Sequence, residues 1–568
     1  MSKSLAIVGA RLNSSRLAGK HLLELAGKPL IEQLWRRLAL CQEVNSFELA
    51  TTADDFNKPL INWAHAHQIC CHPFEGDVND LMARLDNIIQ RQAPDFIIYI
   101  CGDCPLIAPD FIDHALTRLK ASGKDSIKLH DGVISIHEGM AFYSRKGWEK
   151  LMSVSQCAMS REHVGYADRI TPVLDYLSIP DSANYSQIKH RISVDTQADY
   201  RFMEEVYRRW YKIHTVDTIV SLVWVQQQLL EDPMLAAINN HVKQKAANKL
   251  YAKASIYCHL GPSIGLGHYK RSKLIADALQ EYLGIGAIVH VQYEGPQLEK
   301  TSPRLHWYKN ENELLKAMIL DPNPLIVLDL HPDFISLPAL RKTLQPLGDK
   351  NTKIVGIDKL ISIIDELDWL FIPSFNNSFQ HPKVSVGWQN YLFPSMLQQT
   401  KKHQILVLTG GSDALDYGTI LPTLLSKLCT DWPIIWVQGP LAPPPLLPLS
   451  STISVLTDPD DLHELIAESE IILTCYGLSL FESIFSSAAS ILLPTQHLCD
   501  SVELELLIKE HCCLTSSSLP DAISKLEALL SDCSARQKLQ KEASRVFNDH
   551  AGMINLMEDI QRLLEKSV

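Results

Sequence analysis

Short apolar runs alternate with amphipathic segments along the first part of the chain. Leu5–Val8, Phe47–Ala50 and Ile69–Cys71 have the length and composition of strands, and Pro29–Leu40 and Asn57–His67 have helical periodicity. Alternating strand and helix patterns predict an α/β fold with a parallel or mixed sheet. In such a sheet the ligand site lies at the carboxyl ends of the strands.

A break in this pattern separates two halves of the chain. Helical patterns fill Tyr200–Leu230, and a polar segment then leads to a new strand that begins at Ser255. A chain of 568 residues also exceeds one ordinary hydrophobic core. We therefore expect a domain over 1–235, a linker over 236–252, and two further lobes over 253–400 and 401–568.

The composition is that of a soluble globular protein, with 46% hydrophobic and 21% charged residues. A net charge of −12 gives no general reason to bind nucleic acid or an anionic membrane, so a phosphate site must be built locally. The apolar run before Gly9 is too short for a signal peptide, and no run has the length of a spanning helix. We expect a cytoplasmic protein without membrane insertion.

Thirteen cysteines are scattered without a repeating frame, and we expect them to be free thiols. Cys101 and Cys104 match the spacing of a redox or zinc motif. No second pair stands at zinc-ligand spacing, so we interpret this match as coincidence. The pairs Cys70–Cys71 and Cys512–Cys513 are interpreted as small buried hydrophobic residues.

The segment from Gly9 to Lys20 follows the first strand and predicts a phosphate-binding loop. Gly9 and Gly19 allow sharp turns, and the loop brings Arg11, Arg16 and Lys20 into a small space together with two serine hydroxyls. Cations, hydroxyls and free backbone N–H groups suit a polyphosphate. A solvated surface loop is the alternative interpretation.

Asp103 follows a second buried strand, Phe96–Ile100, and Pro105 ends that segment. The pattern places one carboxylate at the carboxyl end of the strand. Mg²⁺ uses one or two protein carboxylates and takes water and phosphate oxygens as its other ligands. Asp103 is therefore a candidate magnesium ligand, and an Asx-turn or a helix cap is the alternative.

These motifs resemble a known family. Arg11–Lys20, followed by Leu25–Leu30, resembles the opening of the sugar-acid cytidylyltransferases, especially the spore-coat-polysaccharide type related to CMP-sialic acid and CMP-Kdo synthetases. Ala18 stands where the family usually has proline. The segments Gly76–Arg84, Ser160–Val164 and Arg191–Thr196 resemble three further family segments. The resemblance implies a nucleotide-diphospho-sugar-transferase-like domain that uses CTP, a sugar acid and Mg²⁺.

The same resemblance implies roles for individual residues. Asp80 and Arg84 would line the nucleotide site, although a simple salt-bridged pair on one helix face is equally consistent with their spacing. Arg161 and His163 would hold the sugar acid. Asp195 would be the second metal ligand, and a helix N-cap is its alternative role.

The implied reaction is attack by the anomeric hydroxyl of a 3-deoxy-2-keto sugar acid on the α-phosphate of CTP, with pyrophosphate leaving. Positioning and charge neutralisation supply most of the catalysis in such transfers, and no side chain is required as a general base. The candidate residues of this half are Lys20, Arg11 and Asp103 for catalysis, Asp103 and Asp195 for Mg²⁺, and Ala10, Ser15, Arg16, Asp80, Arg84, Arg161 and His163 for binding.

The second half opens with Gly265–Gly267, His268 and Arg271. The glycines superficially match a dinucleotide fingerprint, but its third glycine or alanine is missing. The motif instead resembles a loop of the pseudaminic-acid-pathway UDP-sugar hydrolase, which has two Rossmann lobes of the glycosyltransferase-B type. His268 at a helix N-terminus would be a neutral general base. A packing or capping histidine is the alternative.

Later segments extend this second resemblance. Ile471–Glu482 resembles the nucleotide-binding turn and the acidic residue that holds the ribose, while Pro494–Gln496 stands where the family usually has Asn-Gln. Tyr476 and Thr495 depart from the family pattern. The candidate binding residues of this half are Gly267, Arg271, Gly411, Ser412, Gly477, Glu482 and Gln496.

Together the two resemblances predict a bifunctional enzyme of nonulosonic-acid biosynthesis. The carboxyl half would hydrolyse a UDP-linked deoxy-diacetamido sugar, and the amino half would activate the finished sugar acid. A separate sialic-acid-synthase-like enzyme is implied, because no domain for the intervening condensation is present. A glycosyltransferase or a non-catalytic nucleotide-sugar-binding module remains the alternative for the carboxyl half, and a homodimer is left open.

Overall fold

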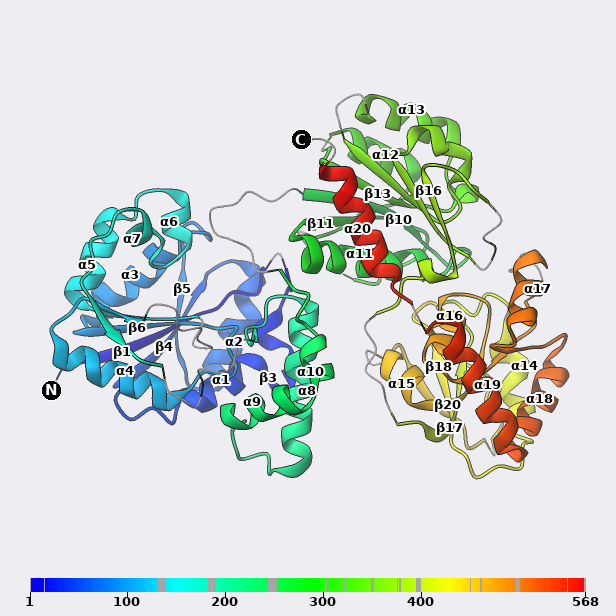
Figure 1. The fold of residues 1–568 in the computed structure, drawn as a ribbon, viewed down its shortest axis with the longest axis horizontal. Helices are drawn as coiled ribbons and strands as arrows, with labels where there is room; N and C mark the ends of the chain where they lie inside the picture. Colours follow the sequence, from blue (N-terminus) through cyan, green and yellow to red (C-terminus); the bar gives the residue numbers. More distant parts are fainter. Residues whose placement is uncertain are drawn as a thin grey trace. The chain divides into compact units, whose positions relative to one another are not determined.

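The computed structural model describes most of the chain, which divides into two compact units, Met1–Leu250 and Tyr251–Val568 (Figure 1). The described residues are 2–14, 16–130, 139–181, 185, 190–243, 253–299, 301, 304–320, 322–348, 352–374, 376, 379–394, 400–449, 451–459, 462–495, 501–548 and 550–565.

The amino-terminal unit contains a mixed sheet of seven described strands in the order β5-β4-β1-β6-β8-β7-β9. The first four are parallel, and β8 runs antiparallel to β6 and β7. This confirms the α/β class. The strands are β1 (Ser4–Gly9), β4 (Ser46–Thr52), β5 (Cys70–Phe74), β6 (Phe96–Cys101), β7 (Ser126–Leu129), β8 (Met140–Ser144) and β9 (Tyr176–Ile179), with a small pair β2 (Glu24–Leu25) and β3 (Lys28–Pro29).

Helices cover this sheet and bury its central strands. Leu5 and Ile7 on β1 and Ile98 on β6 are fully buried, which explains their uninterrupted apolar runs. The helices of the unit are α1 (Leu30–Leu38), α2 (Lys58–Ala66), α3 (Leu81–Gln92), α4 (Pro109–Ser122), α5 (Arg145–Val154), α6 (Ala158–Glu162), α7 (Tyr166–Ile170), α8 (Gln197–Ile213), α9 (Leu222–Glu231) and α10 (Pro233–Ala237), with short 3₁₀ turns at Lys20–Leu22 and Asp55–Asn57.

The amino-terminal unit extends further than the sequence predicts. Asn239 is 1% exposed and donates to Asp199 Oδ1 at 3.0 Å, and its amide oxygen lies 2.5 Å from the Nε2 atom of His190. A residue so buried belongs to the unit's core. The predicted linker over 236–252 therefore begins too early.

The carboxyl-terminal unit contains two separate parallel sheets, as expected for two Rossmann lobes. Their strand orders are β12-β11-β10-β13-β14-β15-β16 and β19-β18-β17-β20-β21-β22. The strands are β10 (Lys253–Leu260), β11 (Gly286–Tyr293), β12 (Leu305–Tyr308), β13 (Leu325–Asp329), β14 (Lys353–Ile357), β15 (Trp369–Pro373), β16 (Val384–Gly387), β17 (Lys402–Leu408), β18 (Ile434–Gln438), β19 (Ser454–Thr457), β20 (Ser469–Thr474), β21 (Ala489–Leu492) and β22 (Leu514–Thr515).

One helix crosses the predicted boundary between the lobes. The helix α20 carries Leu556, Met557 and Ile560, and these side chains belong to the core of the first lobe, next to α11 (Figure 1). The prediction that 401–568 forms one lobe is therefore wrong at its end. The helices are α11 (Gly267–Leu283), α12 (Glu311–Leu320), α13 (Leu337–Gly348), α14 (Tyr417–Leu425), α15 (Leu462–Glu468), α16 (Leu478–Phe485), α17 (Ser501–Glu510), α18 (Leu519–Ser531), α19 (Cys533–Val546) and α20 (Gly552–Glu565), with 3₁₀ turns at Pro332–Phe334, Ile361–Glu366 and Trp388–Asn390.

The described cysteines are all free thiols, as predicted. Cys512 and Cys513 are buried, but Cys70 is exposed and Cys71 only half-buried. The interpretation of the Cys70–Cys71 pair as buried hydrophobic residues is therefore wrong, because β5 is the end strand of its sheet. Among the described residues, no helix combines the length and apolarity needed to cross a bilayer.

Candidate active sites

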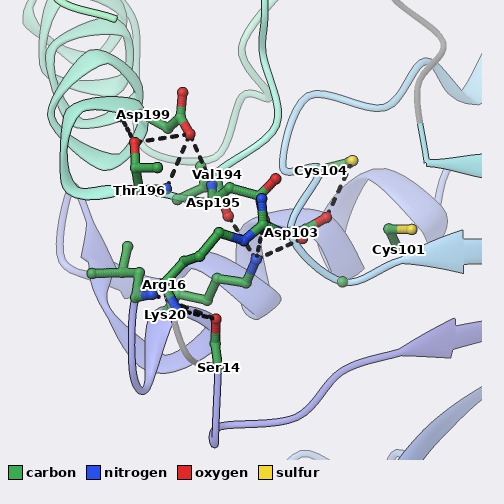
Figure 2. Close-up of polar contacts among 12 residues, drawn as sticks. Ser14, Arg16, Lys20, Cys101, Asp103, Cys104, Val194, Asp195, Thr196 and Asp199 are labelled. Carbon is green, nitrogen blue, oxygen red and sulfur yellow. Dashed lines mark hydrogen bonds and ion pairs between the residues drawn. The ribbon is translucent and has the colours of Figure 1, made fainter. Parts of the chain in front are cut away.

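Lys20 joins three distant segments of the amino-terminal unit. Gly19, in the left-handed region with φ 71°, precedes the 3₁₀ turn that starts at Lys20. The Nζ atom of Lys20 lies 2.6 Å from Asp103 Oδ2 and 3.0 Å from Asp195 Oδ1 (Figure 2). It also donates to the backbone oxygen of Val194 at 2.9 Å. The structure thus brings together the catalytic candidates Lys20 and Asp103 and both predicted metal ligands, Asp103 and Asp195.

The opposite charges of this cluster stabilise one another's ionised forms. Burial alone would lower the pKa of Lys20, but Asp103 and Asp195 outweigh burial and raise it. Burial would raise the pKa of Asp195, but Lys20, Arg16 and Arg191 hold it well below its usual range. Arg16 lies 2.7 Å from Asp195 Oδ1, and Arg191 forms an ion pair with Oδ2. Lys20 and Asp195 are therefore both charged at neutral pH.

Asp195 is not the N-cap of the following helix. Thr196 occupies that position, and Asp199 closes a capping box by accepting from the backbone N–H of Thr196 at 3.0 Å (Figure 2). The N-cap alternative for Asp195 is therefore wrong. Its carboxylate is left to contact cationic side chains.

His21 is a member of this site that the sequence analysis missed. Burial and then the neighbouring Lys20 lower the pKa of His21 to about 4, so the ring is neutral. A neutral ring can donate from Nδ1 to the backbone oxygen of Gly102, 3.1 Å away. This bond fixes the peptide that precedes Asp103. In the sequence, the position of His21 directly after Lys20 was the feature that could have indicated its role in the site.

Gly102 is required by a close approach between two strand ends. Its backbone N–H donates to Gly9 O at 2.9 Å, and a Cβ atom added at Gly102 would lie 2.8 Å from the Cβ of Ala10. The loops after β1 and β6 can meet only without that side chain. Ala10 itself donates its backbone N–H to Ala50 O at 3.1 Å, inside the sheet.

A second group of predicted residues surrounds the start of α3. Asp80 caps this helix and pairs with Arg161 at 2.6 Å, and the structure gives it no ion pair with Arg84. The proposed pair within one helix face is therefore wrong. Arg84 and Arg11 both donate to the backbone oxygen of Val78, at 2.7 and 2.8 Å.

The two guanidinium groups that share the Val78 oxygen favour an anion nearby. Burial and then Arg11 lower the pKa of Arg84, as expected for adjacent like charges in a poorly solvated place. His163 ends α6 as its C-cap residue. Ser15 lies outside the described residues.

The donor set at Lys20 suits a hard cation. Two carboxylate oxygens, one from Asp103 and one from Asp195, converge on the same ammonium group. Mg²⁺ takes oxygen ligands of this kind and usually only one or two from the protein. The two aspartates therefore fit the predicted magnesium site.

The candidate base of the carboxyl-terminal unit forms a buried dyad. His268, in the first turn of α11, places Nδ1 2.6 Å from Asp329 Oδ1 at the end of β13. A carboxylate oxygen can only accept here, so Nδ1 donates and Nε2 carries the lone pair. The sequence analysis did not identify Asp329 as the partner of His268.

Arg271 holds the other side of this carboxylate. It donates to Asp329 Oδ2 at 2.8 Å and Oδ1 at 2.6 Å, and to Asp358 at 3.1 Å. Burial would raise the pKa of Asp329, but Arg271 and His268 outweigh burial and lower it to about 2. Arg271 is thus 5% exposed and engaged with two carboxylates, so its direct role is to fix the dyad.

The loop before α11 contacts two segments of the second lobe. The Oγ atom of Ser412 donates to Pro262 O at 3.0 Å, and a Cβ atom at Gly411 would meet the side chain of Leu266 at 2.0 Å. A Cβ atom at Gly267 would lie 3.7 Å from Leu478, one residue after Gly477. The predicted glycine and serine positions therefore meet around one loop. Gln496 lies outside the described residues.

Glu482, on α16, is a buried acid with few partners. It is 7% exposed, and its Oε1 lies 3.9 Å from the Nδ1 of His463. Burial raises the pKa of Glu482 to about 7, although Lys270 partly offsets this effect. Glu482 therefore titrates near neutral pH.

A cavity of about 610 Å³ lies in the first lobe, and its lining includes Phe334 but neither residue of the dyad. The rings of His268 and His331 are 5.9 Å apart, and those of His331 and Phe334 are 5.3 Å apart. Phe334 and Tyr293 give the cavity aromatic faces, and polar groups come from Gln292, Glu294, Lys309 and Asn310. Its size and mixed lining are those of a small-molecule site.

Comparison with known proteins agrees with the amino-terminal assignment. Residues 5–233 match the family model described as Cytidylyltransferase. The 3-deoxy-manno-octulosonate cytidylyltransferase of Geobacter sulfurreducens is 27% identical, over 31% of this chain and 80% of that protein. The spore coat polysaccharide biosynthesis protein SpsF of Bacillus subtilis is 24% identical, over 37% of this chain and 88% of that protein. These matches support the predicted family for the amino-terminal unit.

The structure of MurG from Acinetobacter baumannii is similar at 15% identity with a TM-score of 0.38, over 55% of this chain and 99% of that one.

Proposed function

We propose that the amino-terminal unit transfers a cytidylyl group from CTP to a 2-keto-3-deoxy sugar acid. The main observation in support is that Asp103 and Asp195 both contact Lys20, in a unit that matches the cytidylyltransferase family. The anomeric hydroxyl of the sugar acid attacks the α-phosphorus of CTP, the bond to the β-phosphate oxygen breaks, and pyrophosphate leaves. The hydroxyl proton passes to solvent.

The residues of the site stabilise charge and position the reactants. Lys20 and Arg16 contact the phosphate oxygens, where negative charge is concentrated during transfer. Asp103 and Asp195 hold Mg²⁺, which when bound neutralises phosphate charge. Arg11 and Arg84 form a second cationic point, and Arg161 and His163 hold the sugar acid.

Substitution of Asp103 tests this proposal. Asp103 lies in a loop and is not a core side chain, so Asp103→Ala should leave the fold intact and abolish CTP-dependent pyrophosphate release. Asp217→Ala is the matched control, because Asp217 is exposed in the same unit. Near-normal pyrophosphate release by Asp103→Ala would reject the site.

The carboxyl-terminal unit is proposed to hydrolyse a UDP-linked deoxy-diacetamido sugar. The dyad of His268 and Asp329 carries this proposal, because it orients a histidine with a lone pair on Nε2 in the lobe that also holds a cavity of sugar-binding size. Nε2 takes a proton from water, and the water oxygen bonds to the anomeric carbon of the sugar. The bond between that carbon and the phosphate oxygen breaks, so UDP leaves and the free sugar is the other product. Glu482 accepts hydrogen bonds from the ribose.

The cavity also favours a second candidate, a glycosyltransferase, because about 610 Å³ would accommodate a sugar acceptor. A binding module without turnover is the third. Incubation of the full chain with UDP-sugar alone separates them. A hydrolase releases UDP at a steady rate without an acceptor, a transferase requires one, and a binding module retains UDP-sugar without releasing UDP.

The two activities belong to one biosynthetic sequence. The hydrolase product is a free amino sugar, and the cytidylyltransferase substrate is a sugar acid that has gained a three-carbon keto-acid unit. A separate synthase that condenses the sugar with phosphoenolpyruvate is expected between them. The proposal thus places both halves in nonulosonic-acid biosynthesis.

A further inference from the structure

Three metal-ligating side chains meet on the edge of the amino-terminal sheet, away from the nucleotide loops. Glu48 on β4 and Cys70 on β5 are directly paired in register, and His72 lies two residues further along β5 on the same face. Glu48 Oε2 and Cys70 Sγ lie 2.5 Å and 3.3 Å from His72 Nε2. One ligand atom of each residue lies within 4.8 Å of the others.

Glu48 is the buried member of this cluster. Its side chain is 6% exposed, and its Oε2 atom lies 2.5 Å from the imidazole Nε2 of His72. A buried carboxylate is stabilised when a cation is close, so a metal ion at this cluster would stabilise Glu48. Cys70 is exposed, so the open side of the cluster gives an ion access from solvent.

We propose that Glu48, Cys70 and His72 form a zinc site. Thiolate, imidazole and carboxylate are the ligands that Zn²⁺ takes, and three protein ligands with one water complete its tetrahedron. The charge of Zn²⁺ balances the combined charge of one thiolate and one carboxylate, so the site becomes neutral. Ligand atoms of a tetrahedral zinc lie about 3.3–3.7 Å apart, so the cysteine and histidine are already placed and Glu48 must rotate outward.

Arg91 would compete with the metal for His72. Its Nη2 atom lies 3.0 Å from His72 Nδ1. Because a guanidinium can only donate, this contact places the ring proton on Nε2, where it faces Glu48. Zinc at Nε2 requires the proton to move to Nδ1 and Arg91 to swing into solvent. Arg91 is exposed, so this movement meets little obstruction, and its removal should not weaken zinc binding.

The position of the site indicates a structural role. The cluster lies in the first half of both strands, whereas the phosphate loop and Asp103 follow the carboxyl ends of β1 and β6. Zinc would cross-link β5, which is the end strand among the described strands of this sheet, to its neighbour β4. Zinc should therefore raise the thermal midpoint of the protein without being required for cytidylyl transfer.

The experiment uses the untagged full chain after treatment with a chelator. Zinc affinity is measured by competition with a chromogenic chelator, and Co²⁺ substitution reports a thiolate-to-metal absorption band. The wild type should show the band and bind zinc. Cys70→Ser should lose the band, His72→Gln should bind zinc at least 10-fold more weakly, and Arg91→Gln should bind as tightly as wild type. Cys71→Ser, one residue away on the opposite strand face, is the matched control and should keep the band.

An unchanged band in Cys70→Ser, or no zinc binding by the wild type, would overturn the proposal. If the substituted proteins fail to fold, alkylation of the wild type decides. Zinc should protect Cys70 from iodoacetamide while Cys429, another exposed thiol, reacts at an unchanged rate. Equal Cys70 reactivity with and without zinc would reject the site.

Discussion

The Nδ1 atom of His268 lies 2.6 Å from Oδ1 of Asp329, and the carboxylate is fully buried. This contact fixes both the tautomer and the orientation of the ring. A histidine that only packed or capped the helix would not require a buried carboxylate. The contact therefore favours the general-base role over the structural one.

Loss of this base should impair UDP release selectively. His268→Asn should lower the rate of UDP release by a factor on the order of 10² to 10⁴, the usual contribution of general-base catalysis. Asp329→Asn should lower it as well, because an amide can donate to Nδ1 and so favour the wrong tautomer. UDP affinity and cytidylyl transfer should survive in His268→Asn. His511→Asn, an exposed histidine of the same unit, is the control.

Full UDP release by His268→Asn would reject the base role. Unfolding of that variant, seen by circular dichroism, would instead favour a packing role.

Lys20 should contribute to CTP use through its charge. Lys20→Ala should reduce kcat/KM for CTP by about 10- to 150-fold, which corresponds to roughly 1.5–3 kcal/mol for a charge-assisted hydrogen bond. Asp195 keeps Arg16 and Arg191 as partners, so the fold should survive. The measurement is steady-state pyrophosphate release beside Lys212→Ala, an exposed lysine. Equal kcat/KM in the two variants would remove Lys20 from the site.

The sequence predicts the parts of this site that depend on local patterns. The apolar run of β1 locates the loop that carries Lys20, and the Gly-Asp pair after β6 locates Asp103. Both follow because buried parallel strands are continuously apolar and ligands bind at their carboxyl ends. The role of Asp195 was ambiguous from the sequence. A helix can begin after either of two adjacent polar residues, and only the observed capping box assigns the N-cap role to Thr196.

Pairings between distant segments could not be predicted in this way. Helical spacing was consistent with a pair between Asp80 and Arg84, but Asp80 pairs with Arg161, which lies 81 residues later. Likewise α20 has an ordinary apolar face, and nothing local indicates that this face packs on the first lobe. Such choices depend on tertiary packing, which hydrophobic periodicity does not encode.

The corrected boundaries predict which truncated chains fold. A fragment of residues 1–243 should be soluble and carry cytidylyl transfer, whereas 1–232 should melt at a lower temperature. The shorter fragment lacks Asn239 and leaves Asp199 without that buried partner, at a cost of about 1–3 kcal/mol. Thermal melts of both fragments check this, and identical midpoints would contradict it.

The carboxyl-terminal boundary makes the matching prediction. A fragment of residues 253–568 should fold and release UDP, while 253–551 should be unstable. Removal of α20 exposes the surface that Leu556, Met557 and Ile560 bury, each contributing about 1.5–3 kcal/mol. A soluble, fully active 253–551 fragment would show that α20 is dispensable.

The titration of Glu482 should make the stability of the carboxyl-terminal unit depend on pH. Its pKa in the folded chain is about 7, above the ordinary value of 4.5, because burial disfavours the charged form. Between these two values the folded state binds more protons than the unfolded state, so stability falls as pH rises. The fall should be complete above pH 7 and amount to roughly 3 kcal/mol.

The variant Glu482→Gln removes the titrating group. Its thermal midpoint should exceed that of the wild type by an amount that grows from pH 4.5 to pH 7 and is constant above pH 7. UDP should reverse the advantage, because the ionised carboxylate accepts hydrogen bonds from the ribose and the amide does so more weakly. Calorimetric melts with and without UDP measure both effects, and a difference between the two proteins that does not change with pH would show that Glu482 is not the titrating group.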